Sequence, residues 1–370
     1  MMSNAISQNV VHLPPPGEDD SHLNSTIFAR AALLGIEDLH FKSDSVTGLK
    51  AIVAIHNTSR GPALGGTRCL NYDSEHDAID DVIRLARSMS YKSAFADLPY
   101  GGGKAVLMHP QQLQNPDAYF ESYGEFVNTF HGRFITAVDV GTSVEDMDKI
   151  ARKTSHVLST SSSRGDPSHD TARGVLRGIQ AAVKAHLKHD DLEGITVAIQ
   201  GVGKVGSYLA QLLHEQGAEL IISDMNQQAA QDCAGCFDAV IVPVDKIMSI
   251  SCDVLAPCAL GASINSRTVH LIKAKIVCGA ANNQLATDHI GDKLYQKQIL
   301  FVPDYVVNAG GLIHVVLASH AEAQTKVSEI YDAVIDLYQR SEKNNEPSHR
   351  VANRIAEQIL YRSKKHVAHL

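Results

Sequence analysis

Two lysines near residue 100 have the residue type and spacing to bind and activate a small anionic substrate. Lys92 and Lys104 bracket an apolar segment, and Lys104 follows the glycines 101–103, whose missing side chains let backbone and ligand approach closely. A lysine shielded from water beside other cations can have a lowered pKa and can then exchange protons with a reacting group. The other lysine can hold a carboxylate. The alternative interpretation is a pair of solvated charges around a glycine turn.

A glycine-rich motif in the second half of the chain is typical of dinucleotide binding. Gly201-Val202-Gly203-Lys204-Val205-Gly206 follows a predicted strand, residues 195–199, and opens a predicted helix. The next predicted strand, residues 220–224, ends in Asp224. The glycines permit a tight turn against a pyrophosphate, and the amino end of the helix supplies free N–H groups. Asp224 is expected to accept hydrogen bonds from ribose hydroxyls and to repel a 2′-phosphate, which favours NAD over NADP.

The elements that position these motifs fall into two domains. A chain of 370 residues exceeds what one hydrophobic core usually supports, and the periodicity breaks at the serine-rich stretch 159–167. Beyond it strands and helices alternate. Together with the two strands above, the remaining ones predict a six-stranded, doubly wound parallel sheet of α/β class. These remaining strands are expected at residues 239–242, 253–256, 276–279 and 299–302, and helices at 171–187, 327–338 and 352–366.

The first half of the chain is expected to hold a second α/β domain. Residues 49–55 and 63–70 have strand patterns, and the glycines beside Leu64 are expected at the mouth of a loop. A helix that begins after Ser74 carries an apolar stripe and delivers Lys92 from its last turn. A further helix is expected after Asn115-Pro116, and a buried strand at 134–138. Asp139 follows this strand, where α/β sheets bind ligands, although an aspartate there can also simply form a turn.

Composition excludes several classes of partner. The net charge of -8 and the absence of a basic run argue against nucleic acid and anionic membranes. Residues 1–25 lack the features of a secretion signal and are interpreted as a disordered extension, so we expect a cytoplasmic protein. The six cysteines are sparse for this length and fit a reducing compartment. Cys233 and Cys236 have the spacing of a zinc knuckle but no second pair, so no metal is expected.

Several separate motifs follow one another along the chain in a fixed order. They are Gly61-Pro62-Ala63-Leu64-Gly65-Gly66-Thr67-Arg68, Ser90-Tyr91-Lys92, residues 101–106, Asp139-Val140-Gly141-Thr142, residues 279–285 and residues 303–311. These motifs resemble those of the glutamate/leucine/phenylalanine/valine dehydrogenase family, and the similarity runs from about residue 25 to the C-terminus. The resemblance implies a substrate-binding and oligomerisation domain at residues 26–160, joined by a C-terminal helix at about 345–370. It also implies an NAD-binding Rossmann domain at 161–344, with a cleft between the two.

The resemblance also implies an activity. It is the NAD-dependent, reversible oxidative deamination of a branched-chain L-amino acid to its 2-oxo acid and ammonium, catalysed by a homo-oligomer. Lys92 would bind the substrate carboxylate, Lys104 would activate water, and Asp139 would shuttle protons to and from nitrogen. The other substrate residues implied are Leu64, Gly65, Gly66, Met89, Ala137, Asn283, Leu312 and Val315. The cofactor residues implied are Thr171, Gly201, Gly203, Lys204, Val205, Gly206, Asp224, Ala256, Cys258, Ala280, Asn282 and Asn308.

Three alternatives remain open at this level. Ala137 resembles leucine-type members, whereas Leu312 resembles phenylalanine-type members, so an aromatic substrate is the first alternative. A non-catalytic NAD-binding regulator is the second, because fold alone does not give function. The third is a hydroxy-acid dehydrogenase, which would rely on a His–acid pair, and no such pair occupies the matched positions. The family's Pro-Val-Thr-Ala-Tyr-Gly run appears as residues 169–174, His-Asp-Thr-Ala-Arg-Gly, which affects the expected nicotinamide contacts.

Overall fold

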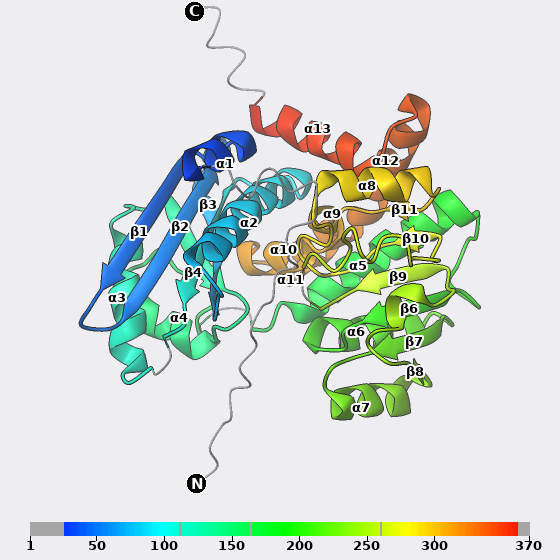
Figure 1. Ribbon diagram of the computed structural model, residues 1–370, viewed down its shortest axis with the longest axis horizontal. Coiled ribbons are helices and arrows are strands. Elements are labelled where there is room, and N and C mark those ends of the chain that lie inside the picture. The colour runs from blue at the N-terminus through cyan, green and yellow to red at the C-terminus, as the bar shows by residue number, and fades with distance from the viewer. Residues whose placement is uncertain (1–25, 111–112, 163–164, 260, 362–370) are drawn as a thin grey trace, which may run out of the picture. The chain divides into compact units, whose positions relative to one another are not determined.

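The computed structural model describes residues 26–110, 113–162, 165–259 and 261–361 (Figure 1). The chain forms two compact units. Unit 1 comprises Met1–Ser90 and Pro99–Gly165, and unit 2 comprises Tyr91–Leu98 and Asp166–Leu370. The division after Gly165 lies within the predicted boundary at 159–167. The long helix α2 (Glu75–Phe95) begins in unit 1, and its last turn belongs to unit 2.

Unit 1 is built on a five-stranded mixed sheet in the order β1-β2-β4-β3-β5. The strands predicted at 49–55, 63–70 and 134–138 are confirmed. Strands β1, β2 and β4 pair antiparallel, while β3 runs parallel to both β4 and β5. The five strands are β1 (Asp38–Asp44), β2 (Leu49–Asn57), β3 (Ala63–Leu70), β4 (Gly101–Met108) and β5 (Phe134–Val138).

Alternation along β2 explains how both faces of this sheet are covered, because successive side chains point to opposite sides. Leu49, Ala51, Val53 and Ile55 share one core with helices α3 (Pro116–Asn128) and α4 (Val144–Ala151). The intervening Ile52 and Ala54 pack instead with the apolar stripe of α2, and α1 (Ile27–Leu34) adds partly buried side chains there. Helices α3 and α4 both have side-chain caps. The Asn115 side chain accepts from the backbone N–H of Ala118, and Ser143 forms a capping box with Asp146.

The glycines before Lys104 and those beside Leu64 lie in strands. The glycines beside Leu64 were expected at the mouth of a loop, and a turn at residues 101–103 was the alternative interpretation of the lysine motif. Gly101–Gly103 opens β4, and Leu64, Gly65 and Gly66 lie in β3. A Cβ at Gly102 would lie 2.0 Å from the backbone nitrogen of Ser90, and one at Gly65 would lie 1.7 Å from the carbonyl oxygen of Gly103. Glycine is therefore required here so that α2 and the neighbouring strand can approach β4 closely.

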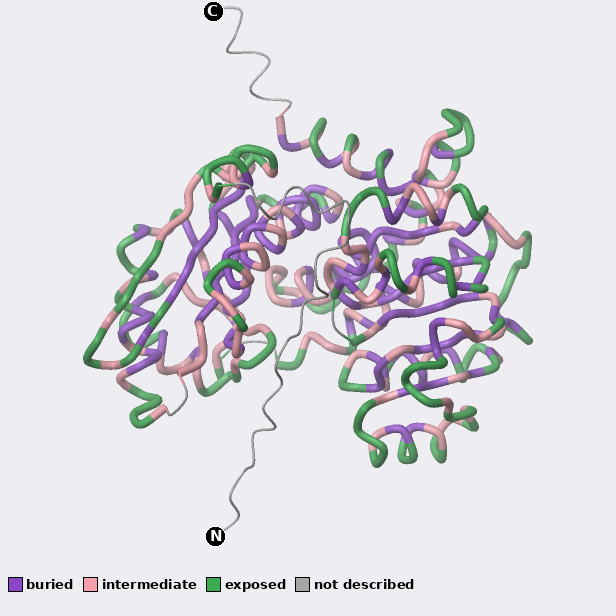
Figure 2. The backbone as a smooth tube through the Cα atoms, in the orientation of Figure 1, coloured by how far each residue is buried: buried purple, intermediate pink, exposed green. Residues whose placement is uncertain are grey.

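Unit 2 contains the predicted six-stranded parallel sheet, in the order β11-β10-β9-β6-β7-β8. The chain leaves β6 toward β7 on one side and later returns to β9 on the other. Ligands of such sheets bind beyond the carboxyl ends of the strands at this reversal point. The strands are β6 (Thr196–Gln200), β7 (Glu219–Ser223), β8 (Val240–Ile241), β9 (Val254–Pro257), β10 (Ile276–Val277) and β11 (Leu300–Phe301). Figure 2 shows that much of both sheets is buried.

The helix predicted at 327–338 is divided between α11 and α12. The one predicted at 352–366 corresponds to α13, and residues 362–366 lie outside the described part of the chain. The expected helix at 171–187 is found as α5 with a π-helical end at Val183–Leu187. Helix α13 packs against α12, α8 and β11 and lies in unit 2, whereas the resemblance joins residues 345–370 to the first domain. The helices are α5 (Ser168–Ala182), α6 (Lys204–His214), α7 (Gln227–Phe237), α8 (Asp288–Gln296), α9 (Asp304–Val307), α10 (Gly310–Val316), α11 (His320–Ser328), α12 (Ile330–Asn344) and α13 (Ser348–Tyr361).

The proposed disordered extension at residues 1–25 lies outside the described residues. Within the described ranges, no helix combines the length and apolar character needed to cross a membrane.

Candidate active site

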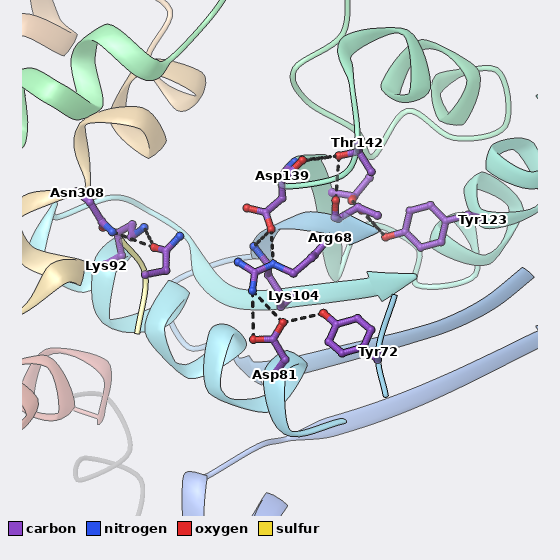
Figure 3. A network of polar contacts seen from close by, with 12 residues as sticks. Arg68, Tyr72, Asp81, Lys92, Lys104, Tyr123, Asp139, Thr142 and Asn308 are labelled. Atoms are coloured by element: carbon purple, nitrogen blue, oxygen red, sulfur yellow. Dashed lines mark hydrogen bonds and ion pairs between the residues drawn. The ribbon is translucent and has the colours of Figure 1, made fainter. Parts of the chain in front are cut away.

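Unit 1 holds an ion pair between the buried Lys104 and the partly buried Asp139 (Figure 3). Lys104 points from β4, is 3% exposed, and its Nζ lies 3.0 Å from Asp139 Oδ2. Asp139 directly follows β5, and its backbone N–H donates to the hydroxyl of Thr142. The same hydroxyl donates to the carbonyl oxygen of Thr67. The two predicted catalytic residues are therefore brought together, and the turn that carries Asp139 is fixed to the sheet.

Arg68 extends this pair into a network that includes helix α2. Its Nε donates to Asp139 Oδ2 over 3.0 Å, and one terminal nitrogen lies 2.8 Å from Asp81 Oδ2. Tyr72 donates its hydroxyl to the same Asp81 oxygen over 2.7 Å. Arg68, Asp81 and Tyr72 were not predicted as site residues from the sequence. Two features of the sequence could have indicated them: Arg68 ends a recognised motif, and Asp81 lies on the polar side of α2.

Burial and neighbouring charges set the protonation of this network. Burial lowers the pKa of Lys104, the Asp139 carboxylate opposes this, and the Arg68 guanidinium adds to the lowering. Burial alone would raise the pKa of Asp139, but Lys104 and Arg68 outweigh it and hold that pKa well below its usual range. Asp139 is thus an ionised acceptor, while Lys104 is shifted toward the neutral amine. A neutral amine can act as a general base.

Gly66 allows the backbone of β3 to lie close to both catalytic groups. A Cβ at this position would lie 2.8 Å from Asp139 Cβ and 3.4 Å from Lys104 Nζ, so a larger residue would collide with the Asp139 side chain. The residue opposite Gly66 in β5 is Ala137, which is partly exposed and has only a methyl side chain. Leu64 in the same strand as Gly66 is 1% exposed and is a core residue, while Met89 on α2 is partly buried.

Unit 2 contains a second polar cluster, around Lys92 (Figure 3). Lys92 is 7% exposed, and its Nζ donates to Asn282 Oδ1 over 3.1 Å. The side-chain amide of Asn308 donates to the same oxygen over 2.9 Å and to the carbonyl oxygen of Ala280 over 3.0 Å. Asn283 has a φ of 51°, and its N–H donates to Asp304. The predicted residues Lys92, Ala280, Asn282 and Asn308 therefore form one connected group, and Asn283 flanks it.

The glycine motif has the geometry expected of a dinucleotide site. Gly201 has a φ of 94°, which favours glycine, and a Cβ at Gly206 would lie 2.0 Å from the carbonyl oxygen of Gly201. Nothing lies within 4 Å of a Cβ placed on Gly203, the residue before α6. Asp224 follows β7 and accepts hydrogen bonds from the N–H groups of Val202 and Asn226, each over 2.8 Å. The loop, the helix end and the acid are thus held together as the motif predicts.

Orphaned polar atoms at this edge of the sheet also fit a bound nucleotide. Among the described residues, Gln200 Oε1, Ser223 Oγ and Asn308 Oδ1 are buried without a hydrogen-bond partner. Gln200 and Ser223 end β6 and β7, where ligands of doubly wound sheets bind. Buried polar atoms rarely stay unpaired, so a ligand that supplies partners would be favourable here.

The remaining predicted cofactor residues differ in exposure. Lys204 is exposed and pairs with Asp166 at 3.2 Å, while Val205 is partly buried. Ala256 is fully buried within β9. Cys258 follows β9, and burial raises the pKa of its thiol to about 12, so it remains neutral.

Helix α10 carries the last predicted substrate residues and contacts the start of α5. Leu312 and Val315 are partly exposed, while Ile313 and His314 between them are buried. Thr171 donates to the carbonyl oxygen of Pro167, and a Cβ at Gly311 would lie 2.5 Å from the Thr171 hydroxyl. The structure also pairs His314 with Asp170, although no His–acid pair was found at the matched positions of the sequence.

The chain matches two family models. Residues 37–156 match the model described as Glu/Leu/Phe/Val dehydrogenase, dimerisation domain. Residues 162–228 and 222–366 match the model described as Glutamate/Leucine/Phenylalanine/Valine dehydrogenase. Together these matches span most of both units.

Similar proteins include dehydrogenases of several amino acids. The leucine dehydrogenase of Bacillus subtilis (strain 168) is 46% identical over 336 residues, which are 89% of this chain and 92% of the relative. The L-tryptophan dehydrogenase of Nostoc punctiforme (strain ATCC 29133 / PCC 73102) is 38% identical over 92% of this chain and 97% of its own. The crystal structure of L-tryptophan dehydrogenase from Nostoc punctiforme has a TM-score of 0.76 at 38% identity, and the match covers 91% of this chain and 99% of that one.

Proposed function

Because the chain belongs to the Glu/Leu/Phe/Val dehydrogenase family, we propose that it catalyses the reversible oxidative deamination of a branched-chain L-amino acid. The products are the corresponding 2-oxo acid and ammonium. We assign NAD as the oxidant, leucine, valine and isoleucine as the substrates, and Lys104 and Asp139 as the catalytic residues.

One observation carries this assignment: the ion pair between the buried Lys104 and the partly buried Asp139. Oxidation of an amine to an imine and hydrolysis of that imine need a proton acceptor at nitrogen and a base that activates water. Asp139 Oδ2 and Lys104 Nζ are 3.0 Å apart, and each can serve one of these needs. A Cβ at position 66 would lie 2.8 Å from Asp139 Cβ, so glycine there keeps the carboxylate in place.

The chemistry of these side chains follows the order of the reaction. Asp139 accepts a proton from the substrate ammonium, which frees the nitrogen lone pair. NAD would be held by the glycine motif 201–206 and Asp224, and it would supply the hydride acceptor for the α-carbon. Lys104 as the neutral amine then removes a proton from the water that attacks the imine carbon. Asp139 returns a proton to nitrogen so that ammonia can leave. Lys92 holds the substrate carboxylate, and the exclusion of water strengthens each of these electrostatic interactions.

The residues of the nucleotide site support NAD rather than NADP. Asp224 is fixed by two backbone N–H groups at the end of β7, and its carboxylate can accept from ribose hydroxyls. A 2′-phosphate at the same place would be repelled. The following residue, Met225, is 89% exposed and offers no positive charge.

The apolar pocket residues support an aliphatic substrate. A charged substrate side chain would lose its hydration without gaining a partner among Leu64, Met89, Ala137, Leu312 and Val315, so glutamate is excluded. In the pocket that the family resemblance implies, the methyl of Ala137 and the bulk of Leu312 would both favour a smaller substrate side chain. Leucine dehydrogenases also have the higher identity to this chain, 46% against 38% for the tryptophan enzyme. An aromatic substrate is the second candidate, because Leu312 resembles phenylalanine-type members.

The test is kcat/KM for oxidative deamination with NAD across leucine, valine, isoleucine, phenylalanine, tryptophan and glutamate. One methylene changes discrimination by only about 1–3 kcal/mol in an apolar pocket, so overlapping activities are expected among the aliphatic substrates. A higher value for phenylalanine or tryptophan than for every aliphatic substrate would overturn the branched-chain assignment. Binding of NADH without turnover of any amino acid would favour the non-catalytic alternative.

We also propose that the protein is a homo-oligomer, since residues 37–156 match a model described as a dimerisation domain. Sedimentation of the full chain tests this, and a monomer at micromolar concentration would contradict it.

A further inference from the structure

A buried histidine–aspartate pair in unit 2 has no role in the mechanism above. Asp170 lies in the first turn of α5 and is 2% exposed, and His314 lies in α10 and is 8% exposed. His314 Nδ1 is 2.6 Å from Asp170 Oδ2. The two residues are 144 positions apart in the sequence. Asp170 is also one of the positions at which residues 169–174 depart from the family's Pro-Val-Thr-Ala-Tyr-Gly run.

The contact between Asp170 and His314 strongly constrains the position of α10 relative to α5. The reason is that few other groups offset the cost of burying the Asp170 carboxylate. Burying an ionised carboxylate is costly unless it is paired and hydrogen-bonded. Among the described residues Asp170 Oδ1 has no hydrogen-bond partner, so Oδ2 and its imidazole carry most of the compensation. The positive end of the α5 dipole adds to it, since Asp170 lies in the first turn. Moving α10 away from α5 would leave the buried Asp170 carboxylate without its hydrogen bond to His314.

The backbones of the same two helices touch one turn earlier. A Cβ at Gly310 would lie 1.9 Å from the carbonyl oxygen of Asp170, and one at Gly311 would lie 2.5 Å from the hydroxyl of Thr171. Both positions therefore need glycine. The close backbone contact at Gly310 fixes the distance between α10 and α5. The hydrogen bond between His314 and Asp170 fixes the rotation of α10.

The opposite side of α10 carries Leu312 and Val315. These residues are three positions apart, so they lie on one face of the helix, and both are partly exposed. We propose that the Asp170–His314 pair positions α10 so that Leu312 and Val315 set the size of the substrate side chain that is accepted. This inference rests on the proposed function, which assigns these two residues to the substrate pocket.

The burial of the pair distinguishes positioning from catalysis. A catalytic imidazole must reach the substrate, as it would in a hydroxy-acid dehydrogenase. Here the ring is held in the interior by Asp170, with the side chain of His314 only 10% exposed. His314 is therefore a positioning residue that acts through the helix on which Leu312 and Val315 stand.

The experiment measures kcat/KM for leucine and phenylalanine in full-length variants, with Tm and NADH affinity as parallel readouts. Asp170→Ala should change the leucine-to-phenylalanine ratio by about tenfold, the scale of discrimination in apolar pockets. Asp170→Asn should stay within about threefold of wild type, because its amide oxygen can still accept from the imidazole. His289→Gln is the matched control, since His289 faces Asp292 at 3.9 Å on the exposed surface of α8.

A second variant separates positioning from stability. Replacing both partners by apolar residues, Asp170→Val with His314→Leu, should recover Tm, because such replacements of buried charged pairs are often neutral for stability. The changed leucine-to-phenylalanine ratio of kcat/KM should persist in this double variant, because the hydrogen bond between His314 and Asp170 is absent.

Three results would overturn the inference. The first is a leucine-to-phenylalanine ratio of kcat/KM that stays within about twofold of wild type in both Asp170→Ala and the double variant. If leucine is still turned over, this result contradicts the inference but not the proposed function. The second is wild-type oxidation of a 2-hydroxy acid that is lost in His314→Gln, which would make the histidine catalytic. The third is a wild type that turns over no amino acid, which overturns the proposed function as well.

Discussion

Replacing Arg68 by glutamine should slow deamination in a manner that depends on pH. Arg68 Nε and Lys104 Nζ each lie 3.0 Å from the same oxygen of Asp139, so the two nitrogens are at most twice that distance apart. At about 6 Å and an effective dielectric constant of about 20, two like charges repel by about 3 kcal/mol. This repulsion favours the neutral form of Lys104. Every 1.4 kcal/mol is a factor of about ten, so removing it lowers the neutral fraction by up to about 100-fold.

The sign of the effect fixes the shape of the pH profile. Without Arg68 the pKa of Lys104 rises, so the neutral amine is scarcer at any pH below that pKa. The variant Arg68→Gln should therefore lose up to about 100-fold in kcat/KM for leucine at neutral pH and recover as the pH rises, while Arg68→Lys, which keeps the charge, should lose much less.

The assay is kcat/KM for leucine and NAD across the pH range in which the folded variants keep their wild-type Tm. A deficit that stays constant with pH would show that Arg68 acts only through the geometry of Asp139. Faster turnover by Arg68→Gln at neutral pH would refute the electrostatic reasoning entirely.

Three further predictions follow from single contacts. Lys104→Ala should lower turnover by at least about 100-fold while NADH binding, measured by fluorescence, persists; retention of more than about a tenth of wild-type activity would refute the assignment. Asp224→Ser with Met225→Arg should raise kcat/KM for NADP relative to NAD, and a wild type that already prefers NADP would contradict the placement of the acid. Gly102→Ala should lower Tm, because its Cβ would lie 2.0 Å from a backbone nitrogen of α2. The control Gly235→Ala has nothing within 4 Å of its Cβ and should be neutral or slightly stabilising; equal Tm changes in the two variants would argue against the packing explanation.

The elements of the fold were largely predictable because their signals are local. Strand patterns predicted β2, β3 and β5, and the strand, glycine motif and acid at Asp224 predicted the order of β6, α6 and β7. The sequence did not predict that the three glycines before Lys104 lie in a strand, since glycine is depleted in strands. Glycine is needed at these positions because a side chain would collide with Ser90, Asn57 or Phe134. These residues are close in space but not in the sequence.

The site was predictable as far as recognised motifs reach. The motifs indicated Lys104 and Asp139, and the structure places their charged atoms 3.0 Å apart. The contacts of Arg68 with Asp81 and Asp139 span 13 and 71 positions of the sequence. The pair of His314 and Asp170 joins two helices of unit 2 that are distant in the sequence. No periodicity or spacing rule connects such residues, because tertiary packing alone brings them together.

The charge balance around Lys104 has a consequence for ligand binding. While Lys104 is protonated, it and Arg68 are matched by Asp139 and Asp81, so this form of the cluster carries no net charge. An amino acid brings a further cation, its ammonium group, into this electroneutral interior. Loss of a proton from Lys104 returns the net charge of the cluster and the substrate ammonium to zero. Substrate association should therefore acidify a weakly buffered solution even before oxidation, whereas a 2-oxo acid, which lacks the ammonium, should bind without this proton release.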